Sequence, residues 1–310
     1  MKAFEQLRIV FFGTPDFAVA FLHALVSAGA AIVAVVTAPD KPAGRGKLPH
    51  APAVKEYAVA HNLPLLQPEK MKNPDFLQEL KALNVDLQVV VAFRMMPVAV
   101  WDMPPMGTLN VHGSLLPQYR GAAPINRAIM NGETETGVTT FKLKHEIDTG
   151  DIMLQEKVAI LPEDNAGTLH DKLMEAGAAL LVRTIKLLAE DNITEVPQDN
   201  TATAVLKNAP KIFKEDTYID WNNNGETIHN FVRGLAPYPA AHTRHNEKGL
   251  KVFAGHYIKE EHDATPGAMQ TDHAAWLRFA TGDGWYYVHE LQLEGKKRMD
   301  VVSFLRGFRG

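Results

Sequence analysis

The sequence predicts an α/β protein, with a Rossmann-like doubly wound parallel sheet domain followed by a small carboxy-terminal β-barrel domain of the OB-like type. Three observations carry this prediction. The chain opens on an apolar run, a glycine turn and a helical period; further apolar runs alternate with helical segments to about residue 189; and short alternating segments separated by turn residues fill the last third. At 310 residues the chain is long enough for two domains.

The first elements form a βαβ opening. Residues 8–12 read as a buried strand ending at Gly13, residues 16–28 have helical spacing, and residues 32–37 return as a strand. Further strands are predicted at residues 85–93, 108–112, 138–143 and 152–158, and a strongly periodic helix at residues 168–188 with capping signals at Asn165 and Gly167. This succession is typical of a parallel sheet covered by helices.

A βαβ opening suggests a dinucleotide, but the first turn does not support one. It reads Gly13-Thr14-Pro15-Asp16-Phe17 and lacks the second and third glycines that let a pyrophosphate approach the backbone. NAD is therefore rejected as the leading ligand.

The composition changes after the predicted helix. Residues 190–210 are polar and contain two prolines, which favours a linker, and the alternating segments at 250–253, 275–280 and 285–291 favour a small β-barrel. We therefore expect a catalytic domain at residues 1–189, a linker at 190–210 and a barrel domain at 211–310.

Composition narrows the class of protein. The chain is 46% hydrophobic and 22% charged, and no apolar run approaches the roughly 20 residues of a membrane span. It contains no cysteine, which excludes disulfides, thiolate metal sites and a cysteine nucleophile. With no export signal visible, a cytoplasmic location fits best. The net charge of −4 argues against nucleic-acid binding over the whole surface but allows a local basic patch.

The candidate active site lies in residues 108–150. Asn110 and His112 project from the same face of a predicted strand, which places an amide donor beside a titratable imidazole. Asp148, in the acidic turn Asp148-Thr149-Gly150, could orient that imidazole. A lone histidine at a strand end is more often a satisfied polar residue, but the irregular loop that follows is where α/β proteins place their ligands.

A second candidate is the basic segment 41–47, which packs Lys41, Arg45 and Lys47 among two glycines and a proline. It predicts a projecting loop that could contact phosphates. An ordinary solvated loop is the alternative on composition alone.

Together these motifs resemble the methionyl-tRNA formyltransferase family. The resemblance rests on the following segments: Gly13-Thr14-Pro15-Asp16-Phe17-Ala18, residues 41–47, residues 110–117, Arg120-Gly121-Ala122-Ala123-Pro124, Asp148-Thr149-Gly150, Ile219-Asp220-Trp221, Pro237-Tyr238-Pro239-Ala240-Ala241 and Gly295-Lys296-Lys297-Arg298-Met299. It covers nearly the whole chain, in matching order and spacing.

The resemblance implies formyl transfer from 10-formyltetrahydrofolate to the α-amino group of methionine on initiator tRNA, with no metal. In that reaction Asn110 and His112 stabilise the negative charge on the formyl oxygen. Asp148 would hold the His112 tautomer and favour its charged form, and it could also help to take a proton from the amine, directly or through water. Which group accepts that proton stays open.

The resemblance also implies binding residues. Ser114, Leu115, Leu116 and Pro117 match the folate-binding stretch, although both leucines could simply be core. The residues expected to contact tRNA are Lys41, Arg45, Lys47, Lys296, Lys297 and Arg298. Because residues 211–310 contain as many acidic as basic side chains, phosphate contacts there must come from such clusters. Arg94 stands where the family is expected to carry glycine, a departure that bears on the folate pocket and not on the reaction. A monomer is expected.

Two alternatives stay open at this point. A related formyltransferase could act on an amino sugar or a nucleotide-biosynthesis amine, against which the basic loop and second domain argue. A non-catalytic RNA-binding protein is the other, against which Asn110, His112 and Asp148 argue.

Overall fold

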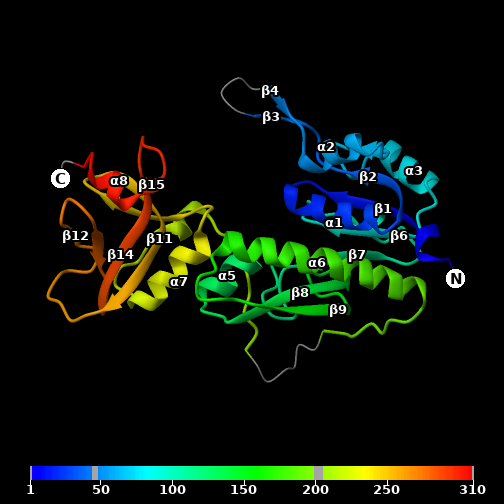
Figure 1. Cartoon of the computed structure of the whole chain (residues 1–310). Coiled ribbons are helices and arrows are strands. Elements are labelled where there is room, and N and C mark those ends of the chain that lie inside the picture. The colour runs from blue at the N-terminus through cyan, green and yellow to red at the C-terminus, as the bar shows by residue number, and fades with distance from the viewer. Residues whose placement is uncertain (1, 44–47, 199–204, 309–310) are drawn as a thin grey trace. The chain divides into compact units, whose positions relative to one another are not determined.

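A computed structural model of the chain describes residues 2–43, 48–198 and 205–308, with only the backbone described at 41–43 and 48–49 (Figure 1). The chain divides into two compact units. The first comprises residues 1–120, 137–158 and 172–207, and the second comprises residues 121–136, 159–171 and 208–310.

The first unit is built on a seven-stranded sheet in the order β5-β2-β1-β6-β7-β8-β9. Its strands are β1 (Arg8–Gly13), β2 (Ala31–Val36), β5 (Leu65–Leu66), β6 (Leu87–Val91), β7 (Thr108–His112), β8 (Glu135–Lys142) and β9 (Ile152–Ala159). The five neighbouring strands β5, β2, β1, β6 and β7 pair in parallel. The predicted Rossmann-like sheet is confirmed.

The predicted βαβ opening is confirmed in detail. Between β1 and β2 the chain forms α1 (Asp16–Ser27), whose Phe21, Leu22 and Leu25 are fully buried. These side chains recur at spacings of one, three and four residues, so they lie on one face of the helix and pack on the sheet.

The sheet is not parallel throughout, because β8 pairs antiparallel to β7 and places Phe141 opposite Asn110 and Thr139 opposite His112. The strand β8 lies between β7 and the edge strand β9, and mixed sheets of this kind are common among α/β proteins. Asn110 therefore stands between a parallel and an antiparallel neighbour, and His112 lies beside the antiparallel one.

The other elements that precede the half-barrel belong to one unit or the other, and all are short apart from one long helix. They are β3 (Lys41–Ala43), β4 (Leu48–His50), α2 (Ala53–Ala60), α3 (Pro74–Ala82), α4 (Val98–Trp101), α5 (Pro124–Met130), α6 (Ala166–Ala189) and the 3-10 helices Phe4–Gln6 and Lys214–Thr217. The long green helix of Figure 1 is α6. As predicted, Asn165 caps it, accepting hydrogen bonds from the backbone N–H groups of Gly167 at 2.8 Å and Thr168 at 3.0 Å.

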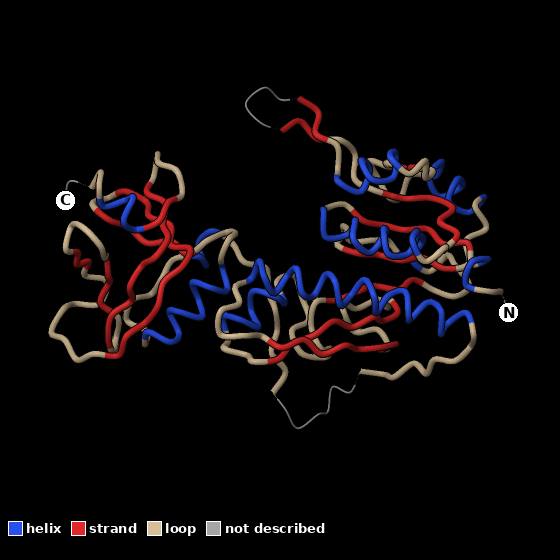
Figure 2. The backbone as a smooth tube through the Cα atoms, viewed as in Figure 1, coloured by secondary structure: helices blue, strands red, loops and turns tan. Residues whose placement is uncertain are grey.

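The second unit contains a six-stranded antiparallel sheet in a half-barrel (Figure 2). Its elements are β10 (Ala241–His245), β11 (Lys248–Lys259), β12 (Met269–Thr271), β13 (Leu277–Ala280), β14 (Gly284–Leu293), β15 (Met299–Asp300), α7 (Gly225–Leu235) and α8 (Val301–Leu305). The three predicted barrel segments fall on β11, β13 and β14. The helix α7 closes the core with Ile228, Val232 and Leu235, and Asn126 of α5 donates to the backbone oxygen of Gly234 at 2.7 Å.

Candidate active site

Strand β7 presents Asn110 and His112 on one face, as the sequence predicts. Asn110 is half-buried, and its side-chain oxygen accepts a hydrogen bond from the backbone N–H of Val111 at 2.8 Å. Because the oxygen of the amide is used in this way, the Nδ2 end is the end that can donate to a substrate.

His112 is anchored by a backbone carbonyl. Only 7% of its surface is exposed, and its Nε2 atom lies 2.7 Å from the backbone oxygen of Tyr119. A carbonyl oxygen can only accept, so Nε2 carries the hydrogen and the neutral ring keeps a lone pair on Nδ1. The tautomer is thus fixed by Tyr119.

Asp148 faces the other nitrogen of the same ring. Its Oδ2 atom lies 3.7 Å from Nδ1 of His112, and its side chain is 11% exposed. The residue has a φ of +56°, a conformation that aspartate and asparagine tolerate better than most residues. Gly150, two residues later, is buried, and a Cβ there would overlap the backbone oxygen of Lys142. The positive φ of Asp148 and the lack of room at Gly150 therefore restrict which residues can form the turn that brings Asp148 to His112.

Gln198 is a site residue that sequence reasoning missed, since the sequence assigns residues 190–210 to a linker. Its amide nitrogen donates to the backbone oxygens of Asp148 at 2.9 Å and Gly150 at 2.7 Å. Its amide oxygen accepts from the Arg120 guanidinium, at 3.0 Å from Nε and 2.6 Å from Nη2. The segment predicted as a linker thus contacts the turn that carries Asp148.

The stretch 114–117 is tied into the protein by its polar groups. Ser114 is fully buried, its hydroxyl donates to the backbone oxygen of Gln118 at 2.6 Å, and its backbone oxygen accepts from the Thr139 hydroxyl at 2.7 Å. The backbone N–H of Leu116 donates to the Thr139 hydroxyl at 3.1 Å, and the backbone oxygen of Leu116 accepts from the Gln155 side chain at 2.9 Å. Leu116 is buried, whereas Leu115 and Pro117 are half-buried.

Arg94, the departure from the family pattern, is directed at another loop. Its guanidinium donates to the backbone oxygens of Pro68 and of Glu69, the latter at 2.8 Å, and lies 5.7 Å from the ring centre of Phe93. Met95 beside it is 81% exposed. Arg94 thus braces the loop after β6, which leaves the sheet next to β7.

The basic residues predicted to contact tRNA fall into two groups. Arg45 and Lys47 lie outside the described residues, and at Lys41 only the backbone, in β3, is described. Lys296, Lys297 and Arg298 are exposed near β15. Arg298 forms a bidentate ion pair with Glu290, at 2.6 Å from each oxygen, which raises the pKa of its guanidinium.

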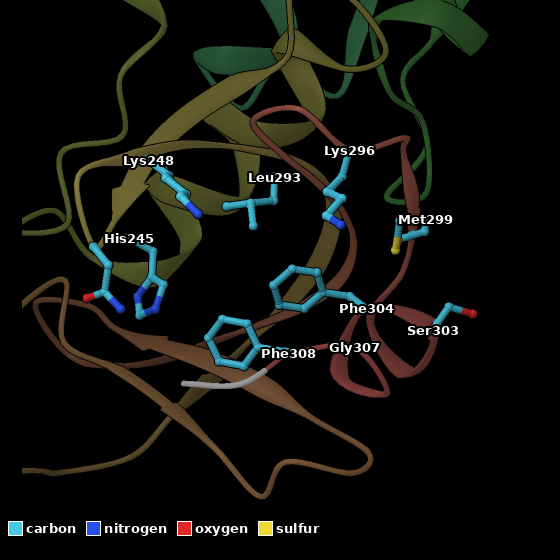
Figure 3. Close-up of a pocket in the computed structure, with 10 residues that line it drawn as sticks. His245, Lys248, Leu293, Lys296, Met299, Ser303, Phe304, Gly307 and Phe308 are labelled. Carbon is cyan, nitrogen blue, oxygen red and sulfur yellow. The ribbon is translucent and has the colours of Figure 1, made fainter.

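A pocket of about 450 Å³ lies in the second unit beside this basic cluster (Figure 3). Phe304 and Phe308 supply its apolar surface, and Lys248 and Lys296 lie at its rim. Burial lowers the pKa of His245, which also lines it.

In the described part of the chain no helix has both the length and the apolar character that crossing a bilayer requires.

Two family models match the chain. The formyl transferase model matches residues 7–185, and the model of the formyl transferase C-terminal domain matches residues 211–309. Together they cover both the Rossmann-like sheet and the half-barrel.

Curated relatives match over nearly their full length. The methionyl-tRNA formyltransferase of Bacteroides fragilis is 51% identical over 311 residues, which covers 98% of this chain and 96% of the relative. That of Parabacteroides distasonis is 52% identical over 313 residues, covering 98% and 97%. Among solved structures, the N-formyltransferase from Helicobacter canadensis in complex with folinic acid and dTDP-3-aminofucose aligns with a TM-score of 0.67 at 18% identity, covering 95% of this chain and all of that one, a likeness of fold alone. From both family models and from these relatives, the chain belongs to the methionyl-tRNA formyltransferase family.

Proposed function

We infer that this chain transfers the formyl group of 10-formyltetrahydrofolate to the α-amino group of methionine on initiator tRNA, for translation initiation. One observation carries the inference: curated methionyl-tRNA formyltransferases are 51 and 52% identical to the chain over 98% of its length. Folate, as co-substrate, supplies the formyl group, and the methionyl-tRNA supplies the attacking amine.

The reaction sets two chemical demands on the protein. A bond forms between the amine nitrogen and the formyl carbon, and the bond from that carbon to the folate nitrogen breaks. The attacking amine loses a proton, and the departing folate nitrogen takes one up. Negative charge develops on the formyl oxygen during the attack. The protein must therefore offer a hydrogen-bond donor to that oxygen and an acceptor for the proton.

We assign the donor to Asn110. Its oxygen is occupied by the N–H of Val111, which leaves the Nδ2 group as the donating end of a side chain fixed on a strand. A fixed donor requires no reorganisation when the charge develops, and one such donor is typically worth about 10² to 10³ in rate.

We assign the proton acceptor to the pair of His112 and Asp148. With Nε2 donating to Tyr119, the lone pair on Nδ1 is basic and lies on the side of the Asp148 carboxylate. A proton taken up between Nδ1 and the carboxylate gives an imidazolium with an acceptor on each side. General base catalysis of this kind typically contributes about 10² to 10⁴ in rate. In the protonated form, His112 also adds positive charge beside the formyl oxygen.

For the folate we propose that residues 114–117 form a wall of the site. The hydrogen bonds of Ser114 and Leu116 within the protein support a rigid wall, with Leu115 and Pro117 as its half-buried apolar surface. A rigid apolar wall suits a flat pterin ring.

For the tRNA we propose that Lys41, Arg45 and Lys47 contact the acceptor end, and that the domain at residues 211–310 contacts phosphates through Lys296, Lys297 and Arg298. Exposed cations bind phosphates without reading sequence, so these contacts orient the tRNA. We further propose that the protein acts as a monomer in the cytoplasm.

The test offers the full-length protein a choice of acceptors. Purified protein and 10-formyltetrahydrofolate are supplied with initiator methionyl-tRNA, with a nucleotide-linked amino sugar, or with free methionine, and each product is measured by mass spectrometry. We expect formylmethionyl-tRNA as the dominant product. Formylation of the amino sugar in place of the tRNA would favour the related sugar formyltransferases, and tRNA binding with no formylation of any acceptor would favour a non-catalytic RNA-binding protein.

A further inference from the structure

The side chain of Gln198 joins two loops whose proximity no sequence pattern predicts. One is the turn of Asp148 and Gly150, to whose backbone oxygens the amide nitrogen donates. The other carries Arg120, whose guanidinium donates twice to the amide oxygen. The residue is 9% exposed, and both donors of its amide nitrogen and both acceptor positions of its oxygen are used.

These two loops are the ones that flank the imidazole of His112. Tyr119, the neighbour of Arg120, accepts from Nε2, and Asp148 faces Nδ1. Gln198 therefore bridges the backbone on one side of the ring to the backbone on the other.

The backbone already tethers the segment around Gln198. Before it, Ile152 and Val196 exchange two backbone hydrogen bonds, at 2.8 and 2.9 Å. After it, the backbone oxygen of Lys207 accepts from the N–H of Tyr119 at 2.6 Å, and its N–H donates to the side chain of Gln118 at 2.8 Å. Backbone hydrogen bonds thus hold the chain at Val196 and at Lys207, and the four hydrogen bonds of the Gln198 side chain act on the two loops.

We propose that Gln198 is a positioning residue that sets the place of the Asp148 carboxylate and of the Tyr119 carbonyl on the two sides of His112. This assignment rests on the proposed function, in which His112 and Asp148 take up the proton of the amine. Gln198 itself touches neither substrate nor proton. A displacement of about 1 Å at a catalytic group can cost about 10²-fold in rate, so loss of the Gln198 hydrogen bonds should lower the rate measurably.

Two substitutions at Gln198 distinguish its hydrogen bonds to the turn of Asp148 from its hydrogen bonds with Arg120. Gln198→Met keeps the length of the side chain and removes all four hydrogen bonds. Gln198→Glu keeps the acceptor for Arg120 but places a carboxylate against the carbonyl oxygens of Asp148 and Gly150, where it cannot donate. We expect both variants to lower kcat by about 10 to 100-fold, while KM for folate and for methionyl-tRNA stays within about threefold of the wild-type value.

The matched control is Gln270→Met. Gln270 accepts from the guanidinium of Arg278, at 3.2 Å from Nε and 2.9 Å from Nη2, so this substitution removes a pair of the same chemistry in the second unit. We expect wild-type kcat and KM from it.

A double substitution tests whether Gln198 acts through Asp148. In a protein that already carries Asp148→Asn, adding Gln198→Met should lower kcat by a smaller factor than in the wild-type protein, because one of the two groups that Gln198 positions no longer accepts the proton. A full multiplicative loss in the double variant would overturn the proposal, as would a wild-type kcat for Gln198→Glu.

A readout independent of activity keeps this proposal separate from the proposed function. The imidazole resonances of His112, assigned by their loss in His112→Gln, should shift in Gln198→Met and stay unchanged in Gln270→Met. An unshifted His112 in Gln198→Met contradicts the positioning role whatever the activity. If the His112 resonances shift in Gln198→Met but the wild-type protein formylates no tRNA, the positioning role stands and the proposed function is wrong.

Discussion

The Nε2 atom of His112 donates a hydrogen bond to the backbone oxygen of Tyr119 at 2.7 Å. This contact decides the chemistry of the ring, because it assigns the hydrogen to Nε2 and leaves the lone pair on Nδ1, which faces Asp148 at 3.7 Å. The backbone thus selects the tautomer, and the carboxylate lies where a proton arriving at Nδ1 gains a partner.

The first prediction concerns this lone pair. Glutamine at position 112 can still donate to the oxygen of Tyr119 but has no basic nitrogen. We expect His112→Gln to fold normally and to lower kcat by about 10² to 10⁴, measured as single-turnover formation of formylmethionyl-tRNA. A variant with near wild-type kcat would show that the ring takes no part in proton transfer.

The second prediction separates the charge of Asp148 from its backbone conformation. Asparagine tolerates the φ of +56° that this residue adopts, whereas alanine is strained there by about 1 kcal/mol. We expect Asp148→Asn and Asp148→Ala both to lose activity, with only the alanine variant less stable, by about 1 kcal/mol in urea unfolding. Equal stabilities of the two variants would contradict the role given to the turn.

The third prediction concerns the basic loop. Removing one phosphate contact should weaken tRNA binding and reduce its dependence on salt, with little effect on folate. We therefore expect Arg45→Ala to raise KM for methionyl-tRNA and to reduce the slope of log affinity against log salt by about 1. The exposed Lys72, changed to alanine, serves as control. A comparable rise in KM for folate in Arg45→Ala would place Arg45 elsewhere.

The fourth prediction is a loss of stability in mild acid. Burial lowers the pKa of His229, with a further contribution from Arg233, and burial also lowers the pKa of His289, next to His256. As pH falls through 6.5, the unfolded chain takes up protons that the folded chain does not, so the free energy of unfolding decreases. Backbone N–H groups of residues 274–276 donate hydrogen bonds that lower the pKa of Asp272 from 3.8, so this carboxylate does not contribute in this window.

Urea unfolding of the full chain at pH 7.5 and 5.5 measures this effect. The midpoint should be lower at pH 5.5, and His229→Gln should reduce the difference between the two pH values. A midpoint that is the same at both pH values would contradict the assignment.

Much of the fold could be predicted from sequence because its signals are local. The apolar run at β1, the spacing of Phe21, Leu22 and Leu25 in α1 and the cap at Asn165 each depend on residues a few positions apart. The helix α7 was not predicted, although Asn224 caps it and Ile228, Val232 and Leu235 recur at helical spacing. Its signal was present but stood among segments that alternate as strands do.

The site could be predicted only in part. Asn110 and His112 were found because alternation along one strand places them together. Tyr119 contributes a backbone carbonyl, which carries no side-chain signal. Gln198 lies 50 residues from Asp148 in the chain, within a polar segment of linker composition. Its contact with the turn of Asp148 depends on how the chain returns to that turn, which no local sequence pattern predicts.

The central claim is that this chain formylates methionyl-tRNA with Asn110 as the donor to the formyl oxygen. Single-turnover formation of formylmethionyl-tRNA by the wild-type protein and by Asn110→Ala tests it most directly. We predict rapid product formation by the wild-type protein and a rate lower by about 10² to 10³ for the variant, with unchanged affinity for methionyl-tRNA. No product from the wild-type protein, or a wild-type rate from Asn110→Ala, would contradict it.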